Sequence, residues 1–305
     1  MEKGIADFFN QCFTMNNWKE LEAKAIEWAK TMGEIQLSYF RKSQLSIKTK
    51  SNIFDIVTAA DKACEQYFQD QLTIHYPDHD MLGEETGIHE KGSDYCWVID
   101  PLDGTTNFSQ GLPIFCVSIG LQYKKETIIG VVYAPYLNEL YTTIKGEGAY
   151  RNGQKLKVSD KTELSRSVIA TGFPYDHGTN PDNNSANIVH ILPKVRGIRR
   201  MGSAAYDLCC VAAGNLDGYW ELNLNLWDVC AGILLVEEAQ GKVISFRNNR
   251  GISIIAGADP LRIAAFLADT HSVRKKEPEQ QREAFDLIRF LFHAIFLRKI
   301  SCLSA

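Results

Sequence analysis

Two aspartates three residues apart, Asp100 and Asp103, follow directly on an apolar run in the stretch WVIDPLDGTTNF (97–108). A buried carboxylate is costly unless a cation or hydrogen-bond donors compensate its charge. Hard divalent cations such as Mg²⁺ prefer oxygen ligands, and proteins hold them with a few carboxylates plus substrate phosphate. Pro101 and Gly104 favour a tight turn that lets both carboxylates reach neighbouring ions, and the Leu102 carbonyl between them is a further ligand. The stretch therefore predicts a site for divalent cations.

The residues after the second aspartate, GTTNF (104–108), have the composition of a turn that enters a short helix. The backbone N–H groups of Gly104, Thr105 and Thr106 would then point at an anion, because the first N–H groups of a helix have no partner within it. A phosphate site beside the cation site is the expected result.

Three further stretches carry acids at the borders of apolar segments: MLGEETG with Glu84 and Glu85, FDIVTAAD with Asp55 and Asp61, and NLWDVCAG with Asp228. Acids at helix starts commonly cap free N–H groups, and for Asp61 or Asp228 alone capping is the favoured interpretation. We assign Asp55 a structural role and Glu85 a supporting one. The four stretches together point to a metal centre.

The elements that must position these acids alternate between helix and strand. Apolar residues recur with helical spacing over residues 18–43, and a second helix is expected after residue 58. Further helices are expected at 184–195, 204–214 and 227–239, and strands at 94–100, 114–124, 127–135, 139–146, 167–173, 217–224, 241–246 and 253–260. This order predicts a layered α/β fold.

Composition excludes several classes of function. The chain has 305 residues, 45% of them hydrophobic, and a net charge of −4, which gives no electrostatic basis for a nucleic-acid partner. Its eight cysteines lie mostly in apolar surroundings, as expected in a reducing compartment. No secretory signal is evident in MEKGIADFFNQCF, so we expect a cytoplasmic protein.

The chain divides into four expected parts: an N-terminal extension (1–17), an α+β lobe with the metal site (18–160), an α/β lobe that completes the site (161–270) and an atypical tail (271–305). Either Met1 or Met15 could be the true start. The apolar part of the tail, DLIRFLFHAIFLRKI, is shorter than the roughly 20 residues that span a bilayer. A helix packed on the body or on another subunit is favoured over a helix at a membrane surface. An altered reading frame at the end of the gene is a third explanation.

Six motifs in this order carry a resemblance to a known family: DIVTAAD (55–61), GEET (83–86), WVIDPLDGTTNF (97–108), MGSAA (201–205), YWE (219–221) and LWDVCAG (226–232). Over about residues 18–268 the chain resembles the inositol monophosphatase family of Mg²⁺-dependent, lithium-sensitive phosphatases, and within it the bacterial-type inositol-1-monophosphatases. The resemblance implies an αβαβα sandwich of the inositol monophosphatase/fructose-1,6-bisphosphatase type.

The resemblance also implies a set of metal ligands. Glu84, Asp100 and the Leu102 carbonyl would hold one Mg²⁺, and Asp100, Asp103 and Asp228 a second. A third, weaker ion near Glu84 is usual in the family. Paired ions of this kind activate a water on one side of phosphorus and stabilise the leaving oxygen on the other.

By the same resemblance, Glu84 and the Thr105 hydroxyl orient the attacking water, and Asp61 accepts a hydrogen bond from Thr105. Lys50 lies where the family has a loop over the metals. Substrate would contact Asp103, Gly104, Thr105, Thr106, Gly202, Ser203, Ala204 and the hydroxyl-binding Glu221. Arg199 could pair with Glu221, or could be a surface arginine.

The expected activity is hydrolysis of a small phosphomonoester, myo-inositol 1-phosphate first of all, by a homodimer without a membrane span. Fructose 1,6-bisphosphate, 3′-phosphoadenosine 5′-phosphate and histidinol phosphate are alternative substrates. A regulatory or binding protein on the same fold is the alternative outside the enzymes.

Overall fold

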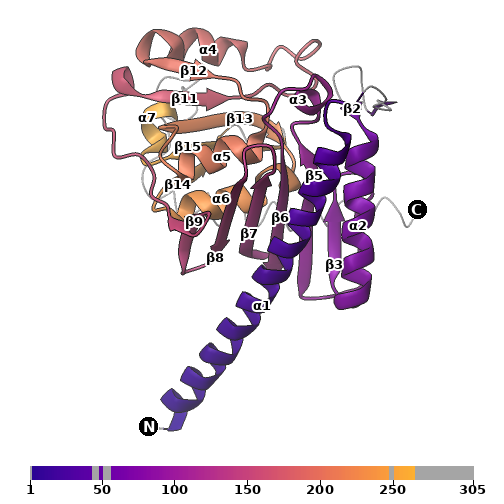
Figure 1. Ribbon diagram of the computed structural model, residues 1–305. Coiled ribbons are helices and arrows are strands. Elements are labelled where there is room, and N and C mark those ends of the chain that lie inside the picture. The colour runs from indigo at the N-terminus through magenta and orange to yellow at the C-terminus, as the bar shows by residue number, and fades with distance from the viewer. Residues whose placement is uncertain (1, 43–47, 51–55, 247–250, 265–305) are drawn as a thin grey trace, which may run out of the picture.

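A computed structural model describes residues 2–42, 48–50, 56–246 and 251–264 as five layers in the order helix, sheet, helix, sheet, helix (Figure 1). Helices α1 (Glu2–Tyr39) and α2 (Ala59–His75) cover the outer face of an eight-stranded sheet. Helices α5 (Ala204–Ala212) and α6 (Leu226–Glu238) pack between that sheet and a five-stranded one. Short helices α4 (Ser185–Ile191) and α7 (Pro260–Ala264) cover the second sheet from outside. The predicted αβαβα sandwich is confirmed.

The eight-stranded sheet has the strand order β10-β9-β8-β7-β6-β5-β3-β4 and is antiparallel except where β3 runs parallel to β5. Its strands are β3 (Asp80–Gly83), β4 (Gly87–His89), β5 (Tyr95–Asp103), β6 (Cys116–Tyr123), β7 (Glu126–Ala134), β8 (Glu139–Ile144), β9 (Gly148–Arg151) and β10 (Gln154–Lys155). Short helix α3 (Thr105–Ser109) follows β5 directly, as the GTTNF stretch predicts. Strands β1 (Lys48–Thr49) and β2 (Ile56–Val57) form a separate ribbon.

The five-stranded sheet has the order β12-β11-β13-β15-β14 and mixes parallel and antiparallel pairs. Its strands are β11 (Val168–Thr171), β12 (Gly197–Arg199), β13 (Gly218–Leu224), β14 (Lys242–Ser245) and β15 (Ile252–Gly257), with 3₁₀ turns at Leu164–Arg166 and Leu192–Lys194. Side chains alternate along β13, so Tyr219 enters the core between the sheets while Trp220 enters the core under α4. Glu221 therefore faces the inner helices.

A bulge in β5 explains how two acids three residues apart can share one site. Side chains three apart on a regular strand point to opposite faces. Here Asp100 pairs with Ser118 and Asp103 with Cys116, so three residues of β5 match two of β6. The extra residue places both carboxylates on one face of the sheet. Pro101 suits the bulge because it has no N–H to donate, and its carbonyl accepts from Gln36 Nε2 at 2.8 Å.

Two glycines let helix α6 approach the sheet closely. Gly120 on β6 pairs with Gly130 on β7. A Cβ atom at Gly120 would lie 2.1 Å from Cys230 Sγ, and one at Gly130 would lie 2.9 Å from the Ala231 carbonyl oxygen. The groove that they leave seats α6 and so brings Asp228, near its start, toward the end of β5.

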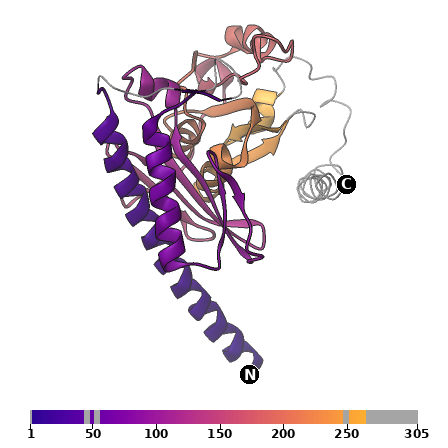
Figure 2. The ribbon, with the colours of Figure 1, turned by 90° about the vertical axis from the view of Figure 1, so that its right-hand side faces the viewer.

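Helix α1 is longer than the sequence predicted, since it begins at Glu2 and includes residues 2–17 of the expected extension. Its first turns run beyond the body, while its later turns lie beside α2 (Figures 1 and 2). Within the described ranges no helix is both long and apolar enough to cross a membrane. The predicted tail, 271–305, lies outside the described residues.

Candidate active site

The carboxylate of Asp103 is tied to the start of helix α5. Its Oδ2 accepts hydrogen bonds from Ser203 Oγ at 2.7 Å and from the Ala205 N–H at 2.7 Å. Asp100 is held more locally, since its Oδ1 accepts from the Leu102 N–H at 2.9 Å. Ser203 is the N-cap of α5, which begins at Ala204 as the predicted helix at 204–214 does.

Asp61 caps α2 and contacts the candidate catalytic threonine at the same time. Its Oδ2 accepts from the Thr58 N–H at 3.0 Å, which closes a capping box. Its Oδ1 accepts from Thr105 Oγ1, also at 3.0 Å. The Thr105 hydroxyl lies equally 3.0 Å from the Leu102 carbonyl oxygen, so it is held between two acceptors. The predicted Asp61–Thr105 contact is present.

Asp228 repeats this arrangement on α6. It is the third residue of the helix, and its Oδ2 accepts from the Asn225 N–H at 2.6 Å within a second capping box. The capping interpretation is therefore correct for both Asp61 and Asp228, and it is compatible with a role in the site. One oxygen caps the helix, and at Asp61 the other demonstrably faces the site.

Glu84 follows β3 directly and lies under the Lys50 ammonium group. Lys50 Nζ is 2.7 Å from Glu84 Oε1 and 2.5 Å from Glu85 Oε1. Glu65 of α2, which the sequence analysis missed, fixes this turn by accepting from the N–H groups of Glu85 at 2.9 Å and Thr86 at 2.8 Å. Its position one helical turn after Asp61, on the buried face of α2, could have revealed it.

The electrostatics of the cluster are those of uncompensated negative charge. Burial raises the pKa of Glu84 to about 7, against the attraction of Lys50. Burial, and then the charges of Glu84, Asp103 and Asp228, raise the pKa of Asp100 well above its ordinary value. Burial and Asp103 do the same to the pKa of Asp228. Buried oxygen donors that repel one another fit hard divalent cations, which would remove the repulsion.

The carboxylates of the cluster do not surround a common centre at metal-ligand distances. No three His, Cys, Asp or Glu side chains among the described residues have metal-ligand spacing. Several of the acids are engaged instead by protein donors, such as Ser203 at Asp103 and Lys50 at Glu84. The predicted ligand set of Glu84, Asp100, the Leu102 carbonyl, Asp103 and Asp228 thus stays a prediction.

The predicted phosphate-binding segment is the tightly packed turn at Gly104 between β5 and α3. Gly104 has a φ of +95°, and a Cβ there would lie 2.9 Å from the Ile114 carbonyl oxygen, so only glycine fits without strain. Asn107 Nδ2 donates to the carbonyls of Ile114 at 2.8 Å and Met201 at 2.6 Å. This amide links the turn after β5 to the segment Gly202–Ala204.

The carboxylate of Glu221 packs directly against Gly172. A Cβ at Gly172 would lie 2.1 Å from both carboxylate oxygens of Glu221. Tyr219 donates its hydroxyl to Glu221 Oε2 at 2.5 Å. Burial raises the pKa of Glu221 to about 7, against the hydrogen bond from Tyr219 and the charge of Arg200.

The suggested pairing of Arg199 with Glu221 is wrong. Arg199 is exposed and donates to the Ile198 carbonyl at 3.1 Å. Its neighbour Arg200 leaves the chain on the other side and lies over Gly202, as expected where side chains alternate. Arg200 is therefore the guanidinium that acts on Glu221.

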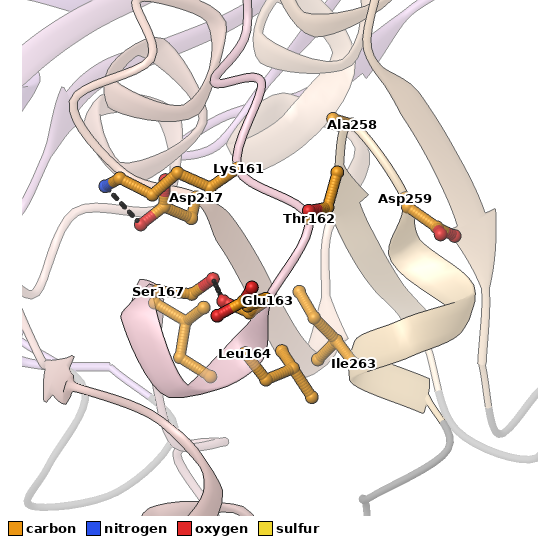
Figure 3. A pocket seen from close by; sticks show the side chains of 10 residues that line it. Lys161, Thr162, Glu163, Leu164, Ser167, Asp217, Ala258, Asp259 and Ile263 are labelled. Carbon is orange, nitrogen blue, oxygen red and sulfur yellow. Dashed lines mark hydrogen bonds and ion pairs between the residues drawn. The ribbon is translucent and has the colours of Figure 1, made fainter.

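A separate hollow lies at the opposite end of β13 (Figure 3). Its buried acid, Asp217, precedes the strand, whereas Asp228 follows it. Asp217 accepts from Ser159 Oγ at 2.5 Å, the Val168 N–H at 2.7 Å and Lys161 Nζ at 3.0 Å. These donors give the acid a structural role.

The profile described as the inositol monophosphatase family matches residues 17–277. The Nus factor SuhB of Pasteurella multocida is 46% identical over 224 residues, which is 73% of this chain and 84% of that one. The inositol-1-monophosphatase of Synechocystis is 40% identical over 233 residues, 76% of this chain and 80% of that one. The solved inositol monophosphatase of Anabaena has a TM-score of 0.72 at 40% identity and covers 81% of this chain and 94% of that one. With the layered fold and these acids, they establish that the chain belongs to the inositol monophosphatase family.

Proposed function

We propose that this protein hydrolyses myo-inositol 1-phosphate to inositol and phosphate in a reaction that depends on Mg²⁺. The observation that carries the proposal is the group of buried, mutually repelling acids at the end of β5, with Asp100 and Asp103 on one face and Glu84 and Asp228 within electrostatic reach. A protein stabilises such a group when cations complete it. The fit of the donor set to Mg²⁺ supports the family assignment.

Glu84, Asp100 and the Leu102 carbonyl would hold one ion, and Asp100, Asp103 and Asp228 a second. When bound, Mg²⁺ would lower the pKa of a water molecule and stabilise negative charge on the phosphoryl oxygens. The ammonium of Lys50 would have to share Glu84 with the first ion, because it already lies 2.7 Å from that carboxylate.

The chain's own residues orient the attacking water and the phosphate. Thr105 is held by Asp61 and by the Leu102 carbonyl, so its oxygen can accept a hydrogen bond from the attacking water. As the proton of that water moves onto the Thr105 oxygen, the hydroxyl proton of Thr105 would pass to the Asp61 carboxylate. The N–H groups of Gly104, Thr105 and Thr106 at the start of α3 would bind phosphoryl oxygens. Neither Asp61 nor Thr105 attacks phosphorus.

The alcohol part of the substrate would lie between Gly202–Ala204 and Glu221. The Glu221 carboxyl, set against Gly172 by its close approach, is suited to bind a substrate hydroxyl. Fructose 1,6-bisphosphate and histidinol phosphate would also bring groups that this carboxyl can bind, and 3′-phosphoadenosine 5′-phosphate is the remaining alternative.

The test is phosphate release from these four compounds with and without Mg²⁺. We expect release that needs Mg²⁺, with inositol 1-phosphate preferred, and none from Asp100→Asn. A preference for another compound would reassign the substrate. Absence of release from all four by folded protein in Mg²⁺ would refute the enzymatic function.

A second candidate function is a binding or regulatory role, because the relative from Pasteurella multocida and another from Haemophilus influenzae at 43% identity are named as Nus factors. Such a role is compatible with catalysis or could replace it. The phosphate-release assay distinguishes the two cases: activity of the purified protein would show that catalysis is retained, and its absence would favour a binding role alone. A homodimer in the cytoplasm remains part of the proposal, and gel filtration with light scattering tests the dimer.

A further inference from the structure

Asp207 on helix α5 is a buried acid that the proposed reaction does not use. Its exposed fraction is 1%, and its Oδ1 has no hydrogen-bond partner among the described residues. Buried polar atoms are nearly always paired, so an orphaned carboxyl oxygen calls for an explanation.

Helix capping does not explain Asp207. The start of α5 is capped by Ser203, whose Oγ accepts from the Tyr206 N–H at 3.4 Å. Asp207 is one residue too late for a capping box, and its own N–H is bonded to the Ser203 carbonyl at 2.9 Å. The side chain is therefore free of the task that occupies Asp61 and Asp228.

Asp207 lies one helical turn beyond Ser203, which holds Asp103. It follows Ser203 by four residues, so the two side chains share the helix face that holds Asp103, and the Cα–Cβ bond of a helical residue tilts toward the helix N-terminus. The Asp207 carboxyl interacts electrostatically with Glu221, Asp103 and Arg200. Glu221 has Tyr219 as a donor and Asp103 has Ser203, whereas Asp207 Oδ1 has none.

We propose that Asp207 is a specificity-determining residue whose free carboxyl oxygen, together with Glu221, binds neighbouring hydroxyl groups on the alcohol part of a polyol phosphate. The inference rests on the proposed function and adds a residue to it. Burial, and then Glu221 and Asp103, raise the pKa of Asp207 well above its ordinary value. An unpartnered carboxyl oxygen can accept a hydrogen bond from one substrate hydroxyl while Glu221 accepts from its neighbour.

The experiment compares two substrates that share the phosphate but differ in the alcohol: inositol 1-phosphate, with neighbouring hydroxyls, and p-nitrophenyl phosphate, with none. The readout is the ratio of their kcat/KM values in the presence of Mg²⁺. For Asp207→Leu we expect this ratio to fall at least tenfold, with the loss in the KM for inositol 1-phosphate. Asp207→Asn keeps a donor and an acceptor and should restore most of the ratio.

Cys210→Ala is the matched control, because Cys210 is a buried residue of the same helix outside the site. Its ratio should equal that of the wild type. If Asp207→Leu does not fold, Asp207→Ala removes the same polar atoms without adding bulk.

A ratio within twofold of the wild type in Asp207→Leu or Asp207→Ala would overturn the inference while leaving the proposed function intact. If the wild type hydrolyses neither substrate, that result would instead refute the proposed function. A tenfold fall in the ratio for Cys210→Ala would also overturn the inference, since it would attribute the effect to repacking of α5.

Discussion

Two buried aspartates flank the core in opposite electrostatic conditions. Asp217, before β13, is met by a hydroxyl, a backbone N–H and the ammonium of Lys161. Asp100, in β5, is met by one N–H and is surrounded by the carboxylates of Glu84, Asp103 and Asp228. Asp100 is 2% exposed and lies within β5, whereas the side chain of Asp217 is 4% exposed and precedes β13.

The difference teaches that burial of a carboxylate does not by itself indicate function. What separates the two is whether the protein supplies the compensating donors. Where it does, the acid holds segments together; where other acids stand instead, the site is incomplete without a cation. Substitutions should therefore affect stability at Asp217 and activity at Asp100.

The largest expected effect is at Asp100. Asp100→Asn should lower kcat/KM by about 1,000-fold, because the charge stabilisation that a metal ion supplies amounts to several kcal/mol and each 1.4 kcal/mol is tenfold. Its melting temperature in metal-free buffer should stay equal or rise, since one repelling charge is removed. Activity within tenfold of the wild type would contradict the assignment.

Thr105 sharpens the comparison with an uncharged group of the same cluster. Thr105→Val removes the hydroxyl bonded to Asp61 and should lower kcat by about 100-fold, the usual scale of a proton-transfer contribution. Thr105→Ser keeps the hydroxyl and serves as the control, with kcat near that of the wild type. Equal losses in both variants would indicate a packing effect of the methyl group.

Asp217 tests the other side of the comparison. Asp217→Ala leaves the Val168 N–H and the Ser159 hydroxyl without their acceptor and should lower the free energy of unfolding by about 2 kcal/mol. Urea denaturation measures this loss. Turnover per folded molecule should be unchanged, and a fall of more than threefold would show that the two regions are coupled.

The smallest expected effect is a pH dependence of stability. Glu84 and Glu221 have a pKa of about 7 in the folded protein, against an ordinary value of 4.5, and burial is the main cause for both. Between these values the folded state holds protons that the unfolded state has lost, so stability falls as pH rises from about 4.5 to about 7 and then levels off.

Mg²⁺ would compete with the proton on Glu84, the proposed metal ligand of the two, so it should stabilise the protein more at pH 8 than at pH 5.5. We expect the gain in melting temperature on adding Mg²⁺ to be larger at pH 8 by roughly 2–4 °C, equivalent to about 1 kcal/mol at this chain length. Thermal melts at the two pH values measure it. An equal gain at both pH values would show that protonation of Glu84 does not compete with the ion.

Apolar periodicity and turn residues predicted most elements and a layered α/β fold, because they are local properties, whereas the αβαβα order of the layers came from the family resemblance. It could not predict the bulge between Asp100 and Asp103, which depends on the register of β5 against β6. It also left undetermined which of two adjacent arginines turns toward Glu221, since that depends on the side from which each leaves the edge strand.

Motifs predicted the candidate site residues and one contact among them, that of Asp61 with Thr105, but not the other residues that hold them in place. Glu65 was missed although it fixes the turn after Glu84. Only its position on the buried face of α2, one turn after Asp61, distinguishes it from a solvated acid. Asp207 was read only as part of an apolar helix. Both become visible when the hydrogen bonds of buried carboxyls are counted.

The two capping boxes bear on how a non-catalytic descendant of this protein could be recognised. Asp61 and Asp228 each secure the first turn of a helix, so a lineage that abandoned hydrolysis would still be selected to keep them for folding. Glu84 and the Thr105 hydroxyl cap no helix, and their loss would cost such a lineage far less. In a survey of paralogues, retention of Glu84 and Thr105 would therefore indicate retained catalysis, whereas retention of Asp61 and Asp228 would indicate only a retained fold.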